Sequence, residues 1–139
     1  MNKDFIAGFI CGEGCFTFRI YQTTKASAVF SICLSDRDSE LLELIVKELE
    51  IKKSKNIMSI MKEKDSEVCY TKGNVLYQLV GLENNIKIVE YFEGHLYGQK
   101  LRQFERYKQG IEILKSAKGR KLSISELKII DSLKASNEY

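Results

Sequence analysis

DFIAGFICGEGCFTFRIY (residues 4–21) joins a predicted helix directly to a predicted strand. In its first half, apolar residues recur at helical spacing behind Asp4, which can serve as the N-cap. The helix is expected to end at the glycines Gly12 and Gly14. From Cys15 to Thr23 the period changes to two, so that one face of the strand is apolar and the other is polar and partly basic.

The same kinds of pattern then repeat along the chain. The expected elements are a strand at 28–35, a helix from a cap at Asp36, Asp38 or Ser39 to Leu49, strands at 56–61 and 74–80, and a helix near 83–94. Residues 68–70 could extend either strand of this second hairpin. This order is αββαββα, an α+β fold with an antiparallel sheet. A helix at 99–115, a basic loop and a last helix, capped by Ser123 or Ser125 and ending near Leu133, complete the chain.

Length and composition limit the class of protein. The 139 residues are 44% hydrophobic and include no proline, which favours one ordered domain over 1–139, with a core at about 1–115 and a helical extension at about 116–139. No apolar stretch approaches the roughly 18 residues of a membrane span, and the N-terminus lacks a secretory pattern. We therefore expect an intracellular, soluble protein with no membrane partner.

Two other side-chain patterns restrict the chemistry. The four cysteines have no CxxC spacing and His95 is the only histidine, so we expect reduced thiols rather than a zinc site. The net charge of +3 is too small to indicate nucleic-acid binding by itself, but residues 52–64 carry five lysines against one glutamate. That segment is a basic patch; a solvated strand edge that uses lysine to discourage aggregation is the alternative interpretation.

Glu13 stands where the first helix meets the first strand. A carboxylate at the C-terminus of a helix lies at the negative end of the helix dipole, which is unfavourable for stability. Together with the last helix carbonyls it could form a hard-oxygen site for Mg²⁺ or Ca²⁺. An exposed glutamate that tolerates a small electrostatic penalty in water is the alternative.

Small residues line one side of the same helix. Ala7, Gly8 and Gly12 share that side, and each glycine inside a helix costs about 0.5–1 kcal/mol relative to alanine. Two such helices could approach each other backbone to backbone. Ordinary packing within the domain is the alternative explanation.

IAGFICGEGCF (residues 6–16) resembles the signature of the LAGLIDADG homing endonucleases, in its variant form LAGFIDGEG. Cys11 stands where the family usually has an aspartate, but the metal-binding acid of the family corresponds to Glu13, which is retained. Three further stretches are similar to the family's second strand and helix, the region after its third helix, and its C-terminal helix: residues 30–45, 95–114 and 121–137. The resemblance covers nearly the whole chain, is weakest at about 51–80, and implies a saddle of antiparallel strands that binds DNA.

The resemblance also implies how the chain assembles. Members of the family pack two signature helices side by side, and this chain holds one signature. We therefore expect a homodimer on a near-palindromic target, because protein symmetry is mirrored in the DNA site. The expected dimer-interface residues are Ala7, Gly8, Cys11 and Gly12.

The implied chemistry is hydrolysis of phosphodiester bonds with a divalent metal. Glu13 and the carbonyl of Gly12 would hold Mg²⁺, for which Ca²⁺ or Mn²⁺ can substitute. Lys100 falls where relatives have a basic residue near the active site; a surface lysine at a helix start is the alternative. Leu34 falls about where some relatives have a glutamine that contacts catalytic water.

Contacts with double-stranded DNA are expected from the polar faces of the strands and from basic segments. Side chains that would read base edges in the major groove are Thr17, Arg19, Tyr21, Ser31, Asn56, Met58, Lys62 and Gln78. Side chains that would contact phosphates are Lys52, Lys53, Lys55, Lys118, Arg120 and Lys121.

Two functions follow from the resemblance. The first is a site-specific, metal-dependent homing endonuclease that makes a double-strand break and promotes the mobility of its own reading frame, as in intron homing. The second, motivated by Cys11 and Leu34, is a non-cleaving relative that acts as an intron RNA-splicing maturase or a DNA-binding regulator. Loss of metal-dependent cutting in Glu13→Gln would separate them.

Overall fold

The computed structural model describes residues 2–22, 24–53, 66–71 and 73–135, and side chains throughout these ranges except at 50–53 and 66–71. The elements follow in the order α1 (Lys3–Glu13), β1 (Gly14–Tyr21), β2 (Lys25–Ser35), a short 3-10 turn (Asp36–Asp38), α2 (Ser39–Lys53), β3 (Ser66–Thr71), β4 (Asn74–Val80), α4 (Leu82–Phe92), α5 (Gly98–Ser116) and α6 (Ile124–Leu133). The predicted αββαββα order with C-terminal helices is therefore confirmed.

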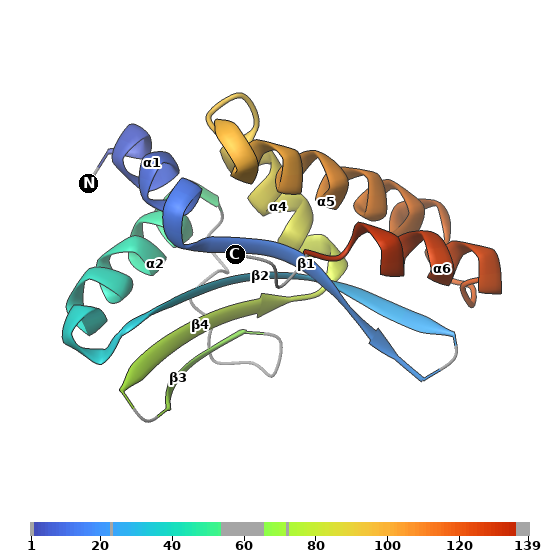
Figure 1. The fold of residues 1–139 in the computed structure, drawn as a ribbon, viewed down its shortest axis with the longest axis horizontal. Helices are drawn as coiled ribbons and strands as arrows, with labels where there is room; N and C mark the ends of the chain where they lie inside the picture. Colours follow the sequence, from blue (N-terminus) through green and yellow to red (C-terminus); the bar gives the residue numbers. More distant parts are fainter. Residues whose placement is uncertain (1, 23, 54–65, 72, 136–139) are drawn as a thin grey trace.

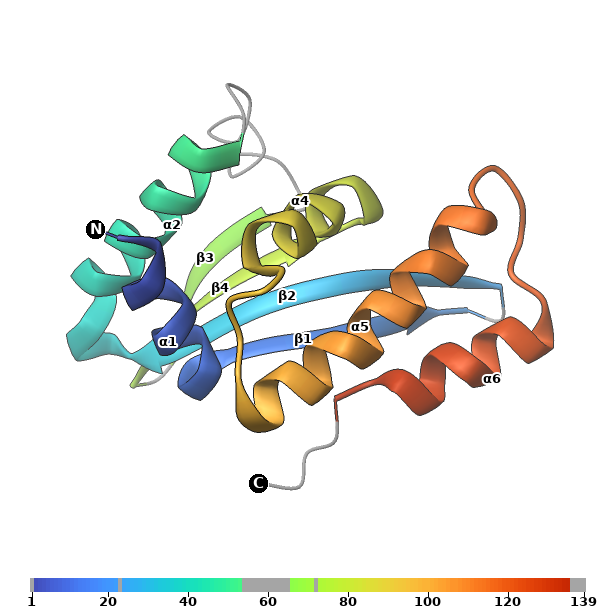
Figure 2. The same cartoon turned by 90° about the horizontal axis from the view of Figure 1, so that it is seen from above.

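The four strands form one antiparallel sheet in the order β1-β2-β4-β3. The sheet is curved, and the helices lie over one of its faces (Figure 1). The view from above shows α1, α4 and α5 crossing the sheet and α6 lying alongside β1 (Figure 2). The core fills the space between helices and sheet, because the apolar residues of alternate strand positions point toward the helices.

One predicted detail of the elements is wrong, and another lies outside the described residues. The N-cap of α1 is Asn2, whose side chain accepts a hydrogen bond of 2.8 Å from the Phe5 amide, and Asp4 lies in the first helical turn. The strand that pairs with β4 is Ser66–Thr71, and the range 56–61 predicted for it lies outside the described residues. The cap of α6 is Ser123, as predicted, in a capping box with Glu126.

Glycine allows α5 and α1 to come close to β1. A Cβ atom on Gly110 of α5 would collide with the ring of Phe18, and one on Gly14 would lie 2.5 Å from Cγ2 of Ile10. Only glycine permits these approaches without displacing the apolar side chain. As a result α5 lies directly over β1, and its first turns reach the junction between α1 and β1 (Figure 2).

Candidate functional site

The junction of α1 and β1 exposes a carboxylate. Glu13 is the last residue of α1, Gly14 is the first of β1, and both Gly12 and Glu13 are exposed. The Glu13 carboxylate therefore lies at the negative end of the helix dipole, beside the last carbonyl groups of the helix. Local sequence explains the geometry, since the helical spacing ends here and alternation begins at once.

Lys100, in the first turn of α5, reaches this junction from above. Its side chain is only 6% exposed, and its Nζ donates a hydrogen bond to the carbonyl oxygen of Gly14, the residue after Glu13. A buried ammonium requires such partners, because desolvation without hydrogen bonds costs several kcal/mol. The structure thus brings the two predicted catalytic residues to one junction, and the interpretation of Lys100 as a surface lysine is wrong.

Gln103, one turn further along α5, was not predicted to belong to this site. It is buried, and its Oε1 accepts a hydrogen bond of 2.7 Å from the amide of Phe16. Lys100 and Gln103 together fix the first three residues of β1 against α5. The sequence signal was the i, i+3 spacing of the two residues, which places them on one helical face.

Gln103→Leu is expected to destabilise the fold by about 1–3 kcal/mol, because the buried Phe16 amide would lose its acceptor. Urea unfolding followed by circular dichroism measures this difference. Gln99→Leu, an exposed position in the same helix, is the matched control and should change stability by about 0.5 kcal/mol or less. Equal stabilities of the two variants would show that the hydrogen bond contributes nothing.

Cys15 lies beside the same lysine. Burial raises the pKa of its thiol, and the positive charge of Lys100 and a hydrogen bond with Ser31 only partly oppose that shift. The thiol therefore stays protonated at neutral pH and is a poor nucleophile or metal ligand. The described residues hold no cluster of three His, Cys, Asp or Glu side chains suited to a metal ion.

The donors at the junction nevertheless fit a hard cation. Glu13 offers one carboxylate and Gly12 a backbone carbonyl, both exposed. Mg²⁺ is commonly bound by one or two carboxylates together with substrate phosphates and water, so an incomplete protein ligand set of this kind suits it.

The exposed side of α1 contains both glycines. Gly8 and Gly12 are exposed, and a Cβ atom at either position would meet no atom within 4 Å among the described residues. Phe5 on the same helix is 48% exposed and stacks on Phe9. Packing inside the described part of the domain therefore does not explain why these two positions are glycine.

Two other predicted interface residues face the inside of the chain. Ala7 is 2% exposed and belongs to the core, and its place in a dimer interface stays a prediction. The Cys11 thiol contacts the carbonyl oxygen of Tyr97 at 3.7 Å, in the segment before α5. Leu34 is also buried in the core, which explains why this position is apolar.

The predicted base-reading residues of the described strands lie on the sheet face turned away from the helices. Arg19 and Tyr21 are exposed there, and Ser31 pairs with Gln78 in the strand register. Thr17 is half-buried, and its Oγ1 accepts a hydrogen bond of 2.9 Å from the amide of Ala135, beyond α6. The structure therefore brings together four of these residues and partly covers the fifth.

The basic residues predicted to contact phosphates are less close together than the predicted base-reading residues. Lys118 pairs with Glu83 at 2.8 Å and Arg120 with Glu126 at 2.8 Å, which lowers the pKa of the Glu126 carboxyl to about 2. Lys121 is exposed in the same loop. Lys52 and Lys53 end α2, whereas four predicted contacts lie outside the described residues: Lys55, Asn56, Met58 and Lys62.

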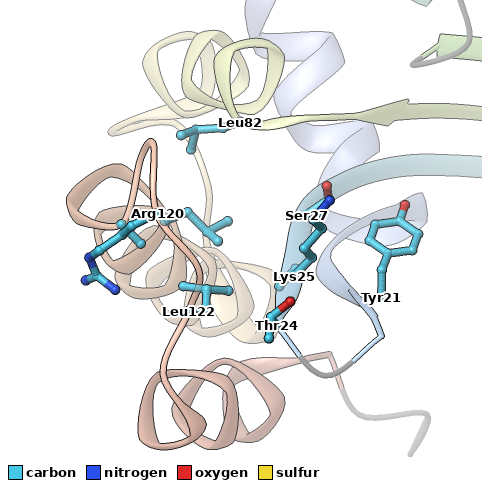
Figure 3. Close-up of a pocket in the computed structure, with 10 residues that line it drawn as sticks. Tyr21, Thr24, Lys25, Ser27, Leu82, Arg120 and Leu122 are labelled. Atoms are coloured by element: carbon cyan, nitrogen blue, oxygen red, sulfur yellow. The ribbon is translucent and has the colours of Figure 1, made fainter.

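The loop between α5 and α6 is anchored to the tip of the β1–β2 hairpin. The amide of Leu122 donates to the carbonyl of Thr24 at 3.2 Å. Between loop and hairpin lies an open cavity of about 260 Å³, and Figure 3 shows Arg120 and Tyr21 on opposite sides of it. The loop between α5 and α6 thus supports the tip of the β1–β2 hairpin.

Comparisons with known proteins agree with this arrangement. Residues 6–111 match the family described as LAGLIDADG endonuclease. Among solved structures, the LAGLIDADG homing endonuclease I-GzeII in complex with its DNA target is 25% identical with a TM-score of 0.75, covering 98% of this chain and 44% of that one. I-SmaMI, bound to uncleaved DNA in the presence of calcium ions, is 25% identical with a TM-score of 0.76, covering 99% and 45%.

This chain spans less than half the length of these two structures. The homing endonuclease I-TnaI, at 20% identity and a TM-score of 0.71, shares the fold at similar length, with coverage of 99% of this chain and 90% of that one. No curated protein matches. In the described residues, no helix is both long and apolar enough to cross a bilayer. Because the family match spans most of the chain and includes α1, β1 and the start of α5, the chain belongs to the LAGLIDADG endonuclease family.

Proposed function

We propose that this chain is a site-specific, divalent-metal-dependent endonuclease that makes a double-strand break in a long, near-palindromic DNA as a homodimer. The observation that carries the proposal is the exposed Glu13 at the α1–β1 junction, with the amine of Lys100 bonded to the next residue. A carboxylate and an ammonium that converge at the rim of an antiparallel sheet suit phosphodiester hydrolysis.

In this proposal Glu13 and the Gly12 carbonyl hold Mg²⁺, or Ca²⁺ or Mn²⁺ in its place. The bound ion would stabilise charge at the scissile phosphate and lower the pKa of a bound water. Lys100 would place positive charge near the phosphate. Gln103 would hold β1 against α5 through its hydrogen bond with Phe16, so that this charge stays in position.

The homodimer is supported by α1. Gly8 and Gly12 leave its exposed side without side chains, so a second α1 could approach closely, and Phe5 adds apolar surface beside them. This chain covers 44% and 45% of the two DNA-bound structures, so two copies together would be about as long as one of those chains. Each copy would then supply one Glu13, one for each strand cut.

A cleavage selection tests the proposal. Purified protein would be incubated with Mg²⁺ and a plasmid library that carries randomised duplex segments, and linear products would be sequenced. We expect linear plasmids cut within a symmetric site, and no linear product in EDTA. Tight, salt-dependent binding without cutting would instead support the maturase or regulator.

Lys100→Met is expected to slow cleavage about 100-fold or more, because the charge near the reacting phosphate is lost while the side-chain volume is kept. Single-turnover cleavage of a selected site measures the rate, and a DNA-binding titration should give nearly the same affinity as the wild type. Lys115→Met, an exposed lysine of the same helix, is the control. A full cleavage rate in Lys100→Met would remove Lys100 from the mechanism.

A further inference from the structure

The sheet face turned away from the helices changes in chemistry along β1 and β2. Near Glu13, the described side chains of this face carry no charge. We call them the inner group; its members are Cys15, Ser31, Cys33, Leu76 and Gln78. Cys33 is exposed and the other four are half-buried, so their small apolar or neutral polar atoms form this part of the surface.

The opposite end of the face is basic and aromatic. Arg19, Tyr21 and Lys25, the outer group, lie beside the hairpin tip, and all three are exposed. Nη1 of Arg19 is 3.4 Å from the Tyr21 hydroxyl, and the guanidinium carbon is 6.0 Å from the centre of the Tyr21 ring. Tyr21 thus holds the Arg19 guanidinium on the outer surface. This contact uses only one of the five N–H donors of the guanidinium.

The two groups lie at different positions along β1. From Cys15 to Arg19 the strand rises about 3.3 Å per residue, or about 13 Å, which equals about four base-pair steps of DNA. Between the two groups Val29 is buried, and the Thr17 hydroxyl accepts a hydrogen bond from the Ala135 amide. The middle of the face therefore has few side-chain atoms available to contact bases. Inner and outer groups would therefore meet different base pairs.

Each group matches one kind of base edge in the major groove. Apolar atoms and thiols, which behave as small hydrophobic groups, pack against the C5-methyl of thymine. A guanidinium pairs with both O6 and N7 of guanine. We propose that each half-site is rich in A·T pairs beside the cut, where the inner group packs on thymine methyls, and carries at its outer end a guanine read by Arg19.

This inference rests on the proposed function, because Glu13 at the cut sets which end of the face is inner. The test begins with symmetric sites selected from a randomised duplex library. Selected sites should show A·T pairs near the centre and a G·C pair about four steps further out. Replacing inner thymines by uracil, which removes only the methyl, should weaken binding about fourfold per contacted methyl.

Two variants assign the contacts. Arg19→Ala should reduce the preference for the outer guanine about 10-fold or more and leave the inner preference unchanged. Cys33→Ser should reduce the penalty for inner uracil, because a hydroxyl gains less from a methyl than a thiol does. Lys128→Ala, on the exposed side of α6, should change neither preference.

The outcomes separate the two proposals. A selected symmetric site without inner A·T pairs, or wild-type binding that is indifferent to inner uracil, would overturn the inference and leave the nuclease intact. Selection of no symmetric site at all would contradict the proposed function, and this inference with it.

Discussion

Glu13→Gln is expected to reduce metal-dependent cleavage by about 1,000-fold or more, while DNA affinity without metal stays equal or rises. The amide keeps the size of the side chain but removes the charged oxygen that would bind the cation, and several kcal/mol of charge stabilisation are lost with it. Affinity need not fall, because a neutral side chain does not repel phosphates.

Single-turnover cleavage of a selected site over a range of Mg²⁺ concentrations measures the effect. Glu112→Gln removes one carboxylate from an exposed position on α5 and so matches the change in net charge. Glu112→Gln should unfold close to the wild-type temperature, and Glu13→Gln at that temperature or slightly above it, because a negative charge at the helix C-terminus is removed. If Glu13→Gln cuts at the rate of Glu112→Gln, the α1–β1 junction is not the metal site.

Gly8→Leu is expected to convert the proposed homodimer into a folded monomer. Within the described part of its own chain, a Cβ atom at this position meets nothing within 4 Å, and the residue borders an open cavity of about 340 Å³ beside Asp4 and His95. Leucine also favours a helix over glycine by about 0.5–1 kcal/mol, so the monomer should not lose stability. Two leucines would hold a pair of α1 helices apart and raise the dissociation constant by several orders of magnitude.

Sedimentation equilibrium gives the dissociation constant, and circular dichroism reports the fold. Lys128→Leu adds the same side chain to an exposed position of α6 and should remain dimeric. A Gly8→Leu protein with the wild-type dissociation constant would place the interface elsewhere than on α1.

Periodicity predicted the elements best where one face of each element is buried. The residues of β1 and β2 alternate strictly enough to fix both strands, and α1 ends where that alternation begins. In the second hairpin the strand at 74–80 was predicted correctly, but β3 could not be bounded from the sequence, because residues 51–73 mix lysines with isolated apolar residues and carry no sustained alternation. The cap of α1 is Asn2 rather than Asp4; both residue types cap helices, and only the structure shows where the first turn begins.

At the candidate site, too, some residues could be predicted from local sequence patterns and others could not. Glu13 was visible in the sequence because a carboxylate at a helix C-terminus conflicts with the dipole. Ala7 and Gly8 could not be separated, since a small residue on a helix fits a core and an interface equally well. The role of Gln103 depends on a contact with Phe16 across 87 positions, which no local pattern encodes.

Those same α5 contacts have a consequence for solubility. β1 is an edge strand of the sheet, and the free edge of a strand can recruit strands from other molecules into aggregates. Here Lys100 binds the outward carbonyl of Gly14, Gln103 binds the outward amide of Phe16, and α6 runs alongside the rest of the strand (Figure 2). These contacts occupy backbone groups through which another strand could pair with β1, so the residues that anchor the proposed cleavage centre also disfavour edge-to-edge association at this strand.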